Sequence, residues 1–504
     1  MGKGLKTVVI LLSLTLILRG SAADMIPTSS WIYESVEVLQ AAGYFQNLDK
    51  GNRPWSRFEI SSILIDIDVN DLSANSLKIE LGRLLYEFKS EIEVISSSGE
   101  KDNFRFYVGL SDNYLTNARN YISIRLSGSL NLNRNLSLKY GAYVDQHFMD
   151  DPYYDGYEWR GFQGYQEQMY INWNSSNIDL KFGRDYIKWG YGHTGNLLIS
   201  DNSRPFDQFS LKVRSRYISF QTFVAQLDKM YNANRYLNAA RFEIKPVANL
   251  SVGLGQSSLY GGENQSLDFT MSNPLAFYSF TQDNDRKSMN MMLYADFAWY
   301  FRNKYKLYSE FLVDDFQIDH EVKSDLEPNE LAFLFGIQAV DLFFDTHGWL
   351  EFVQVRNRTY NVPDARPFEK FLHKNMPIAH PLGTDFQLFQ IHLDRWMNSH
   401  FRLDLDYSSL RQGEGTIRGE FTEPWMADEV TMETGYKEKI PYGIIETTNK
   451  IYASLHYEYN VHLQSDLSIG YETIDNLEHL EGNKSDNLFL NLNLYLAFDC
   501  LKIF

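Results

Sequence analysis

The sequence predicts an all-β transmembrane barrel of about 18 antiparallel strands in a bacterial outer membrane, with a small α-helical domain at its N-terminus. Three observations support this fold class. Apolar and polar residues alternate with a period of two from residue 103 onward, and short turns alternate with long polar loops. Aromatic residues make up 15% of the chain although the mean hydropathy is only −0.36, as expected of strands with one apolar and one polar face.

Composition and charge exclude several classes of protein. The 504 residues include 47 Lys and Arg against 65 Asp and Glu, a net charge of −18, which is unsuited to binding nucleic-acid phosphates. The mean hydropathy excludes a bundle of apolar membrane helices. Cys500 is the only cysteine, which excludes an intrachain disulfide framework and a cysteine-based zinc cluster. We therefore expect no nucleic-acid partner.

The first 23 residues have the three-part order of a secretory signal peptide. Lys3 and Lys6 precede an apolar core, Thr7–Leu18, which is too short to span a bilayer as a helix. Ser21–Ala23 provides small residues for cleavage. We expect cleavage before Asp24, and hence export of the rest of the chain.

Residues 24–98 show helical rather than strand periodicity, and we expect them to form a periplasmic helical bundle. One helix should end at Gly43, and a second should begin after Pro54 with the capping-box pair Ser56 and Glu59. A third helix is predicted by an apolar stripe that consists of Leu77, Leu81, Leu85 and Phe88. So small a domain has a thin core, and we expect it to pack against the barrel as a plug.

The barrel is expected over residues 99–504, and its clearest hairpin lies between residues 122 and 144. Apolar residues occupy every second position there on both sides of a turn at Asn133–Asn135, so one face is apolar and the other polar. The same pattern recurs in further segments, which are 169–182, 291–313, 451–471 and the last strand, 488–498.

Connections between the predicted strands alternate in length. Short turns are expected near 133–135, 174–177, 214–216, 245–248, 301–304, 344–348, 397–400 and 460–462. Long polar stretches lie between them, at 145–166, 185–208, 256–288, 356–385 and 409–447. Short periplasmic turns and long outer loops are the anatomy of an outer-membrane barrel. A soluble β-sandwich or propeller would show the same local alternation, but neither explains the alternating connection lengths or the absence of a blade-length repeat.

No motif for catalysis, metal binding or cofactor binding is present. The sequence contains no H-E-x-x-H, no G-x-S-x-G and no glycine-rich phosphate-binding loop, and its 11 histidines are scattered among strands and loops. We therefore predict no catalytic residue, no metal ligand and no cofactor, and a protein that is not an enzyme.

The long stretch after residue 145 contains a cluster of aromatic and charged residues. Sugars present apolar C–H faces flanked by hydroxyl groups, so aromatic rings beside carboxylates and an arginine suit them as ligands. The candidate carbohydrate-binding residues are Tyr153, Tyr154, Tyr157, Trp159 and Arg160. The alternative interpretation is an aromatic girdle at the outer membrane interface.

One run of residues, Gly183–Phe206, stands apart from the strand pattern and contains the sequence Trp-Gly-Tyr-Gly-His-Thr-Gly. Together with Phe352–Arg356, Thr359–Asn361 and Ala379–Asp385, it resembles the Wzi-type capsule assembly family of outer-membrane proteins. The motif residues, for which a structural and a binding role are both open, are Arg184, Trp189, Gly190, Gly192, Ser200, Asp201, Asn202, Arg204, Pro205, His380 and Gly383.

The resemblance implies an outer-membrane barrel of eighteen strands with a helical bundle at its periplasmic end. It also implies a lectin-like role, in which the protein holds capsular or other surface polysaccharide at the cell surface. The partners implied are that polysaccharide, outer-membrane lipid and the machinery that inserts barrels. Two positions depart from the expected family pattern: Tyr191 replaces a proline, and Glu351–Val353 replaces an acidic-Tyr-Thr sequence.

Two other functions remain open from the sequence. A polar lumen suits a diffusion channel or substrate-specific porin as well as a lectin. The segment from Tyr33 to Arg57 has a spacing loosely similar to a surface-layer homology repeat, which would make the helical domain a peptidoglycan anchor.

Overall fold

The computed structural model describes residues 24–96, 103–115, 121–132, 135–154, 156–175, 177–285, 287–317, 321–460 and 463–503. The expected signal peptide, residues 1–23, and the domain boundary expected between residues 98 and 99 lie outside the described residues. No helix in the described part of the chain is long and apolar enough to cross a membrane.

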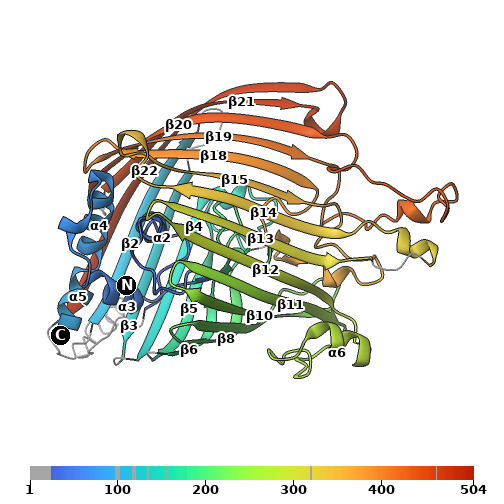
Figure 1. The fold of residues 1–504 in the computed structure, drawn as a ribbon, viewed down its shortest axis with the longest axis horizontal. Coiled ribbons are helices and arrows are strands. Elements are labelled where there is room, and N and C mark those ends of the chain that lie inside the picture. Colours follow the sequence, from blue (N-terminus) through green and yellow to red (C-terminus); the bar gives the residue numbers. More distant parts are fainter. Residues whose placement is uncertain are drawn as a thin grey trace.

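The dominant element is a closed barrel of antiparallel strands, in which β22 (Lys484–Ile503) pairs with β2 (Asn103–Leu115) to complete the ring (Figure 1). The other barrel strands are β3 (Tyr121–Asn131), β4 (Leu136–Asp145), β5 (Gln163–Asn174), β6 (Ile178–Asp185), β8 (Phe206–Arg214), β9 (Ile218–Gln226), β10 (Asn234–Val247), β11 (Leu250–Gly262), β12 (Asn290–Phe301), β13 (Tyr305–Asp315), β14 (Glu330–Ala339), β15 (His347–Val355), β18 (Phe386–Trp396), β19 (Phe401–Gln412), β20 (Glu446–Asn460) and β21 (Leu463–Asp475). The predicted fold class and the number of 18 strands are confirmed.

The short connections lie at one end of the barrel and the long loops at the other (Figure 1). The eight predicted short turns fall between strands that pair with each other. The one expected at 245–248 lies at 248–249 because β10 continues to Val247, and the one expected at 344–348 lies at 340–346 because β15 begins at His347. Parts of three of these predicted turns, residues 133–134, 176 and 461–462, lie outside the described residues. The loops contain α6 (Tyr278–Asp285) and the short pair β16 (Leu372–His373) and β17 (Met376–Pro377). Short 3-10 helices occur at Val69–Asp71, Gln146–Met149, Lys323–Leu326, Phe343–Asp345, Pro367–Glu369, Pro424–Met426 and Leu477–His479.

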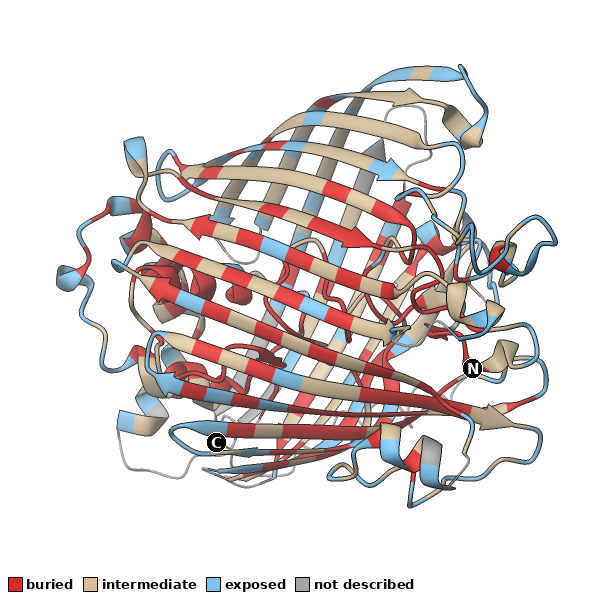
Figure 2. Cartoon of the chain, turned by 45° about the vertical axis from the view of Figure 1, so that its right-hand side comes forward, coloured by how far each residue is buried: buried red, intermediate tan, exposed pale blue. Residues whose placement is uncertain are grey.

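Burial alternates along the barrel strands (Figure 2). The buried positions are mostly polar and face the lumen, and the exposed positions are mostly apolar and face outward. On β13, Lys306 and Glu310 are buried, whereas the neighbouring Phe311 is 44% exposed. Large apolar side chains with exposed outer faces occur all round the barrel; examples are Leu126, Phe182, Phe242, Trp299, Leu405, Ile469 and Phe498. A belt of this kind buries its apolar surface only in lipid, so the barrel is the membrane-spanning unit.

The N-terminal segment forms helices at the short-turn end of the barrel (Figure 1). They are α2 (Ile32–Ala41), α3 (Arg57–Leu64), α4 (Asn75–Glu87) and α5 (Lys89–Ser96). The predicted stop at Gly43, where φ is +100°, and the capping box of Ser56 and Glu59 are both present. α5 was not predicted as a separate helix. The apolar stripe of α4 continues into α5, so the sequence pattern does not reveal the break between them.

The helical domain is anchored in the lumen by buried polar contacts. The Lys245 ammonium on β10 donates a hydrogen bond to the carbonyl of Leu48 at 2.8 Å. The Trp396 indole on β18 donates to the carboxylate of Glu80 on α4 at 2.6 Å. Residues of the segment that resembled a surface-layer repeat are buried, among them Tyr33, Arg53 and Arg57. These three residues therefore present no surface to a cell wall.

Candidate functional site

The loop between β6 and β8, residues 186–205, folds into the lumen; we call it the inward loop. Its strand β7 (Lys188–Trp189) pairs with β1 (Asn52–Arg53) of the N-terminal segment. The amide of Gly190 donates to the carbonyl of Gly51 at 3.0 Å. The inward loop and the helical domain therefore contact each other inside the barrel and together occupy its interior.

The carboxylate of Glu310, a fully buried residue on β13, holds the tip of the inward loop. Its Oε1 accepts hydrogen bonds from the amides of Tyr191 at 2.8 Å and Gly192 at 3.1 Å. The Asn196 side chain also donates to Oε1 at 2.6 Å, and the amide of Leu197 donates to Oε2 at 2.8 Å. Four hydrogen bonds to one carboxyl group fix the loop against the barrel wall.

The carboxylate of Glu351 on β15 holds the next part of the inward loop. It accepts hydrogen bonds from the amides of His193 and Thr194, both at 2.9 Å, and from the Thr194 hydroxyl. The Tyr308 hydroxyl on β13 donates to it at 2.9 Å. Glu351 occupies the acidic position of the family pattern, so the departure noted in the sequence keeps the carboxylate. Glu310 was missed by the sequence analysis, because an acid at a lumen-facing position is ordinary in a polar lumen.

Two glycines of the family motif are required by the geometry of the inward loop. Gly190 has φ +110°, and a Cβ there would overlap with Oε1 of Glu310. A Cβ at Gly192 would overlap with the carbonyl oxygen of Gly195. Both positions therefore exclude a side chain, which supports a structural role for them.

Other motif residues join the inward loop to the loop that carries β16 and β17. The amide of Ser200 donates to the carbonyl of Ile378 at 2.9 Å, and the Asn202 side chain donates to the carbonyl of Pro377 at 2.7 Å. These bonds connect segments almost 180 residues apart in sequence. The two long loops are thereby packed together inside the barrel mouth.

The remaining inward-loop residues of the motif are also engaged within the protein. Trp189 is fully buried and donates its indole N–H to Gln221 on β9 at 2.9 Å. Asp201 forms an ion pair with Lys188 at 3.3 Å. Pro205 is buried where the chain re-enters the barrel wall.

Two neutral histidines, His193 and His380, lie inside the barrel; His380 is buried, and the side chain of His193 is 16% exposed. The His193 ring stacks on Trp349 with centroids 4.7 Å apart, and Nε2 of His380 lies 3.2 Å from the Thr194 hydroxyl. Burial lowers the pKa of both imidazoles to about 3, so neither is charged near neutral pH. Gly383, with φ +75°, closes the turn after His380 by donating its amide to the His380 carbonyl at 2.9 Å.

Arg184, by contrast, faces away from the lumen. It lies on the same face of β6 as Phe182, whose ring is 67% exposed. Its guanidinium forms a two-pronged ion pair with Asp207 on β8, at 2.8 and 2.6 Å. The Arg184 side chain therefore lies outside the lumen, away from the other motif residues, and contacts the neighbouring strand.

Arg204 connects the inward loop to the outer loop between β4 and β5, residues 146–162, which we call the aromatic loop. Its guanidinium donates to the carboxylate of Asp151 at 2.7 Å. It also lies over the rings of Phe148 and Tyr165, 4.8 and 5.0 Å from their centroids. Charge pairing and cation–π contacts thus fix the base of the aromatic loop.

Two of the predicted carbohydrate-binding residues are engaged by the protein itself. The Tyr154 hydroxyl donates to the carbonyl of Gly164 at 2.8 Å and accepts from its amide at 3.0 Å. The Tyr153 ring lies 4.1 Å from the guanidinium carbon of Arg418. Both tyrosines are half-buried, so their rings support the aromatic loop rather than its exposed tip.

The other three predicted residues lie together at the exposed tip of the aromatic loop. Tyr157 is 84% exposed and Trp159 is 61% exposed. The guanidinium carbon of Arg160 lies 5.1 Å from the centroid of the Trp159 ring. The tip thus offers two apolar ring faces with a cation beside them.

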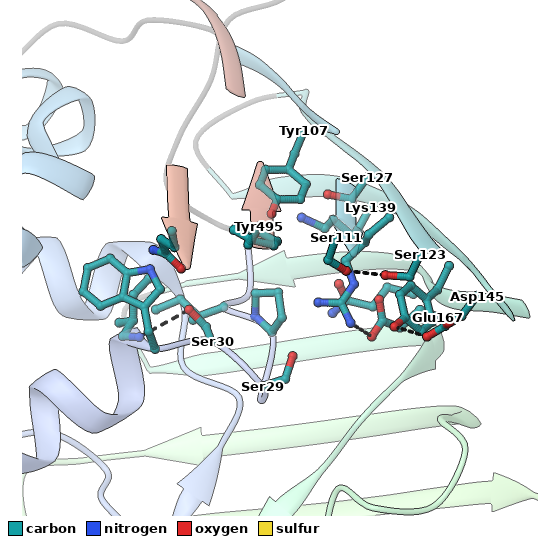
Figure 3. A pocket seen from close by; sticks show the side chains of 18 of the residues that line it. Ser29, Ser30, Tyr107, Ser111, Ser123, Ser127, Lys139, Asp145, Glu167 and Tyr495 are labelled. Atoms are coloured by element: carbon teal, nitrogen blue, oxygen red, sulfur yellow. Dashed lines mark hydrogen bonds and ion pairs between the residues drawn. The ribbon is translucent and has the colours of Figure 1, made fainter. Parts of the chain in front are cut away.

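A polar cavity of about 520 Å³ lies between the helical domain and the inner faces of neighbouring barrel strands (Figure 3). Its charges are paired: Arg125 with Glu167 at 3.1 Å, and Lys139 with Asp24 at 3.3 Å. Hydroxyl groups complete its lining, from Tyr107, Ser111, Ser123, Ser127, Tyr143 and Tyr495. Such a lining can hold water or a small polyhydroxylated molecule.

Comparisons with known proteins give a family and a fold. Residues 97–488 match the sequence profile of the family described as capsule assembly protein Wzi. Among solved structures, the chain is similar to Wzi of Escherichia coli, described as an outer membrane protein involved in group 1 capsule assembly and a carbohydrate-binding β-barrel. The identity is 14%, the match covers 94% of this chain and 99% of that one, and the TM-score is 0.63.

A second structural match is OccD3 of Pseudomonas aeruginosa. It has 12% identity, covers 79% of this chain and 90% of that one, and has a TM-score of 0.42. No curated protein matches the sequence.

Proposed function

The chain belongs to the Wzi capsule assembly protein family, and from that membership we propose that it holds capsular or related surface polysaccharide at the outer membrane without catalysing a reaction. The observation that carries this proposal is the exposed group of Tyr157, Trp159 and Arg160 on the aromatic loop. We call this group the ring platform.

The chemistry of the ring platform suits a sugar chain. Tyrosine and tryptophan combine a flat apolar face with a polar edge, so they can cover sugar C–H groups while hydroxyls remain hydrogen-bonded. Arg160 adds a donor for hydroxyl or carboxylate oxygens. Because Arg204 and Tyr154 hold the base of the loop, less conformational freedom is lost when the platform binds.

The inward loop has a different role in this proposal. Most of its motif residues are buried, and the half-buried ones, Asp201, Asn202 and Arg204, are bonded to other parts of the chain. In this proposal they therefore shape the interior of the barrel and do not touch the sugar. The resemblance left a structural and a binding role open for these residues, and their burial supports the structural one.

A channel function is not favoured by this arrangement. A diffusion porin needs a continuous polar path, whereas the helical domain and the inward loop fill the interior from its two ends and meet at β1 and β7. We expect no steady conductance steps when the purified protein is inserted in a planar bilayer. Regular open steps would restore the channel hypothesis.

The orientation in the membrane follows from the same proposal. We place the helical domain and the short turns in the periplasm and the aromatic loop outside the cell. The apolar belt then contacts outer-membrane lipid, and the exported chain reaches the membrane through the barrel insertion machinery.

The decisive experiment is a titration of the detergent-purified full chain with polysaccharide purified from the surface of its host. We expect saturable binding that weakens about five- to 150-fold in the Tyr157→Ala, Trp159→Ala double variant, since two aromatic contacts contribute roughly 0.5–1.5 kcal/mol each. The matched control is Phe269→Ala, which removes a ring that is 86% exposed on the loop between β11 and β12. Equal binding by the double variant and the control would overturn the ring platform.

A further inference from the structure

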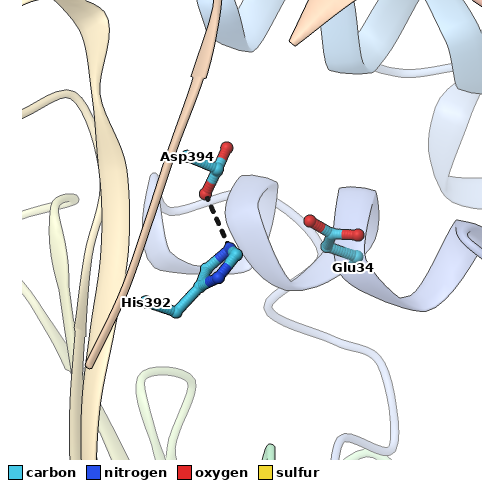
Figure 4. A group of neighbouring side chains, drawn as sticks. All are labelled: Glu34, His392 and Asp394. Atoms are coloured by element: carbon cyan, nitrogen blue, oxygen red, sulfur yellow. Dashed lines mark ion pairs between the residues drawn. The ribbon is translucent and has the colours of Figure 1, made fainter. Parts of the chain in front are cut away.

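A second group of polar side chains lies where the helical domain meets the barrel wall (Figure 4). Glu34 reaches from α2, and His392 and Asp394 project from the lumen face of β18. One potential ligand atom from each of the three residues lies within 4.8 Å of the others. Neither the inward loop nor the ring platform involves these residues.

We propose that Glu34, His392 and Asp394 bind a divalent metal ion of the zinc class. An imidazole nitrogen with two carboxylate oxygens is a ligand set that zinc accepts, with a fourth position left for water. The ion would bridge the helical domain to the barrel wall. This proposal is independent of the polysaccharide function.

The spacing of the two ligands on β18 fits a shared ion better than a direct bond. Nε2 of His392 and Oδ1 of Asp394 are 3.7 Å apart, which is too long for a hydrogen bond. Two ligands with bonds of about 2.0–2.1 Å at a tetrahedral angle would be about 3.3 Å apart. The side chain of Glu34 is 46% exposed, so it can move to complete the site.

The His392 ring is oriented as a metal-bound imidazole would be. Its Nδ1 lies 2.9 Å from Oδ1 of Asp406, on the adjacent strand β19. A carboxylate only accepts, so Nδ1 carries the proton and donates it. This contact directs Nε2 toward Asp394, and a carboxylate behind a histidine is the usual second partner of such ligands.

The charge around the site also calls for a cation. Asp404 lies directly opposite Asp394 in the β18–β19 register, and its Oδ1 is buried with no hydrogen-bond partner among the described residues. Arg402 is shared between Glu34, at 2.7 Å, and Asp404, at 3.0 Å. Asp404 also pairs with Nε2 of His456 at 2.8 Å, whereas the ion pair of Asp394 among the described residues is its 3.7 Å contact with His392. A buried carboxylate such as Asp394 is costly without further compensation.

A nearby histidine provides a matched control. His456 on β20 has both ring nitrogens engaged: Nε2 lies 2.8 Å from Asp404, and Nδ1 lies 2.5 Å from Asp466. It has no nitrogen left for a metal ion. His392 and His456 thus share the same acidic surroundings, but only His392 is expected to bind metal.

The test is a titration of the full chain in detergent, after removal of metal with a chelator, using Zn²⁺ against a chromophoric competitor. We expect one equivalent of Zn²⁺ to bind, with an affinity at least 100-fold lower in His392→Ala and about 10–100-fold lower in Asp406→Asn. His456→Ala should change the affinity less than threefold. A shift in gel mobility on heating would establish that each variant contains a folded barrel.

Two results would overturn the proposal. One is a folded wild-type barrel that does not bind Zn²⁺. The other is an equal loss of affinity in His392→Ala and His456→Ala, with Ca²⁺ competing as well as Zn²⁺, which would indicate general attraction to an acidic patch. If His392→Ala fails to fold, the Asp406→Asn affinity and the visible absorption of bound Co²⁺ decide, since an unchanged affinity and spectrum contradict the site.

Discussion

The inward loop and the aromatic loop belong to the same mouth of the barrel but show opposite environments. Most of the inward loop is buried, and its backbone amides are bonded to Glu310 and Glu351 on the wall. The tip of the aromatic loop exposes Tyr157 and Trp159 to solvent. Arg204 links the two loops.

The residues that identify the family are therefore different from those proposed to contact a ligand. The motif that makes the sequence recognisable consists mainly of residues that fold one loop into the lumen. Loops exposed to solvent tolerate change, so the ligand preference of one member can depend on a segment that the motif does not contain. Four predictions, from the largest expected effect to the smallest, test this contrast.

Glu310→Ala should have the largest effect. It removes the acceptor of four hydrogen bonds, and each buried donor left without a partner typically costs about 1–3 kcal/mol. We expect a lower midpoint of thermal unfolding in detergent and the appearance of conductance in planar bilayers. Glu429→Ala, on an exposed loop, is the control. A variant as stable and as closed as wild type would show that the inward loop does not depend on this carboxylate.

Gly190→Ala should destabilise the protein by about 1–3 kcal/mol, because a side chain is strained at φ +110° and also overlaps with Glu310. Gly482→Ala is a matched control: φ is +78° there, but a Cβ would meet nothing within 4 Å. Unfolding in urea should separate the two variants. If both variants lost the same free energy of unfolding, backbone strain alone would account for the destabilisation, and the close approach to Glu310 would not contribute.

Acidification should weaken the inward loop. The pKa of His193 and of His380 is about 3 in the folded protein, below the usual value near 6.5, so the unfolded chain binds more protons between these values. Stability contributed by their neutral state is therefore complete above about pH 6.5 and falls by up to about 1.4 kcal/mol per pH unit for each histidine below it. Unfolding followed from pH 7 to pH 5 measures this slope. A His193→Gln, His380→Gln variant with an unchanged slope would contradict the assignment.

Tyr154→Phe should have the smallest effect. It removes the hydroxyl bonds to Gly164 at the base of the aromatic loop, worth about 0.5–1.5 kcal/mol, and keeps the ring. We expect polysaccharide affinity to fall a few-fold with little change in the unfolding midpoint. The titration described above measures it, and an effect as large as that of the Tyr157, Trp159 double variant would place the binding site at the base of the loop.

Much of the fold could be predicted because its signals are local. The alternation along each strand, the positions of the short turns and the capping box of Ser56 and Glu59 depend on residues close together in sequence. The break between α4 and α5 was missed, since one apolar stripe runs through both helices.

The interior of the barrel could not be predicted in the same way. Glu310 and Asn196 are 114 residues apart, and nothing in the local pattern distinguishes Glu310 from other lumen-facing polar residues. The same holds for Glu34, His392 and Asp394, which the structure brings together from a helix and a distant strand. The predicted aromatic residues also differ in exposure: Tyr153 and Tyr154 contact the protein, whereas Tyr157 and Trp159 are exposed. The sequence alone does not show which rings of a loop contact the rest of the chain.

The measurement that tests the contrast most directly is hydroxyl-radical footprinting of the full chain, read by mass spectrometry with and without the host's surface polysaccharide. We expect Tyr157 and Trp159 to be oxidised in the free protein and protected by polysaccharide, while Trp189 and Tyr191 stay unmodified in both states. Protection of the cavity residues Tyr107 and Tyr143, with no change at Tyr157 and Trp159, would contradict this expectation and place the sugar in the lumen.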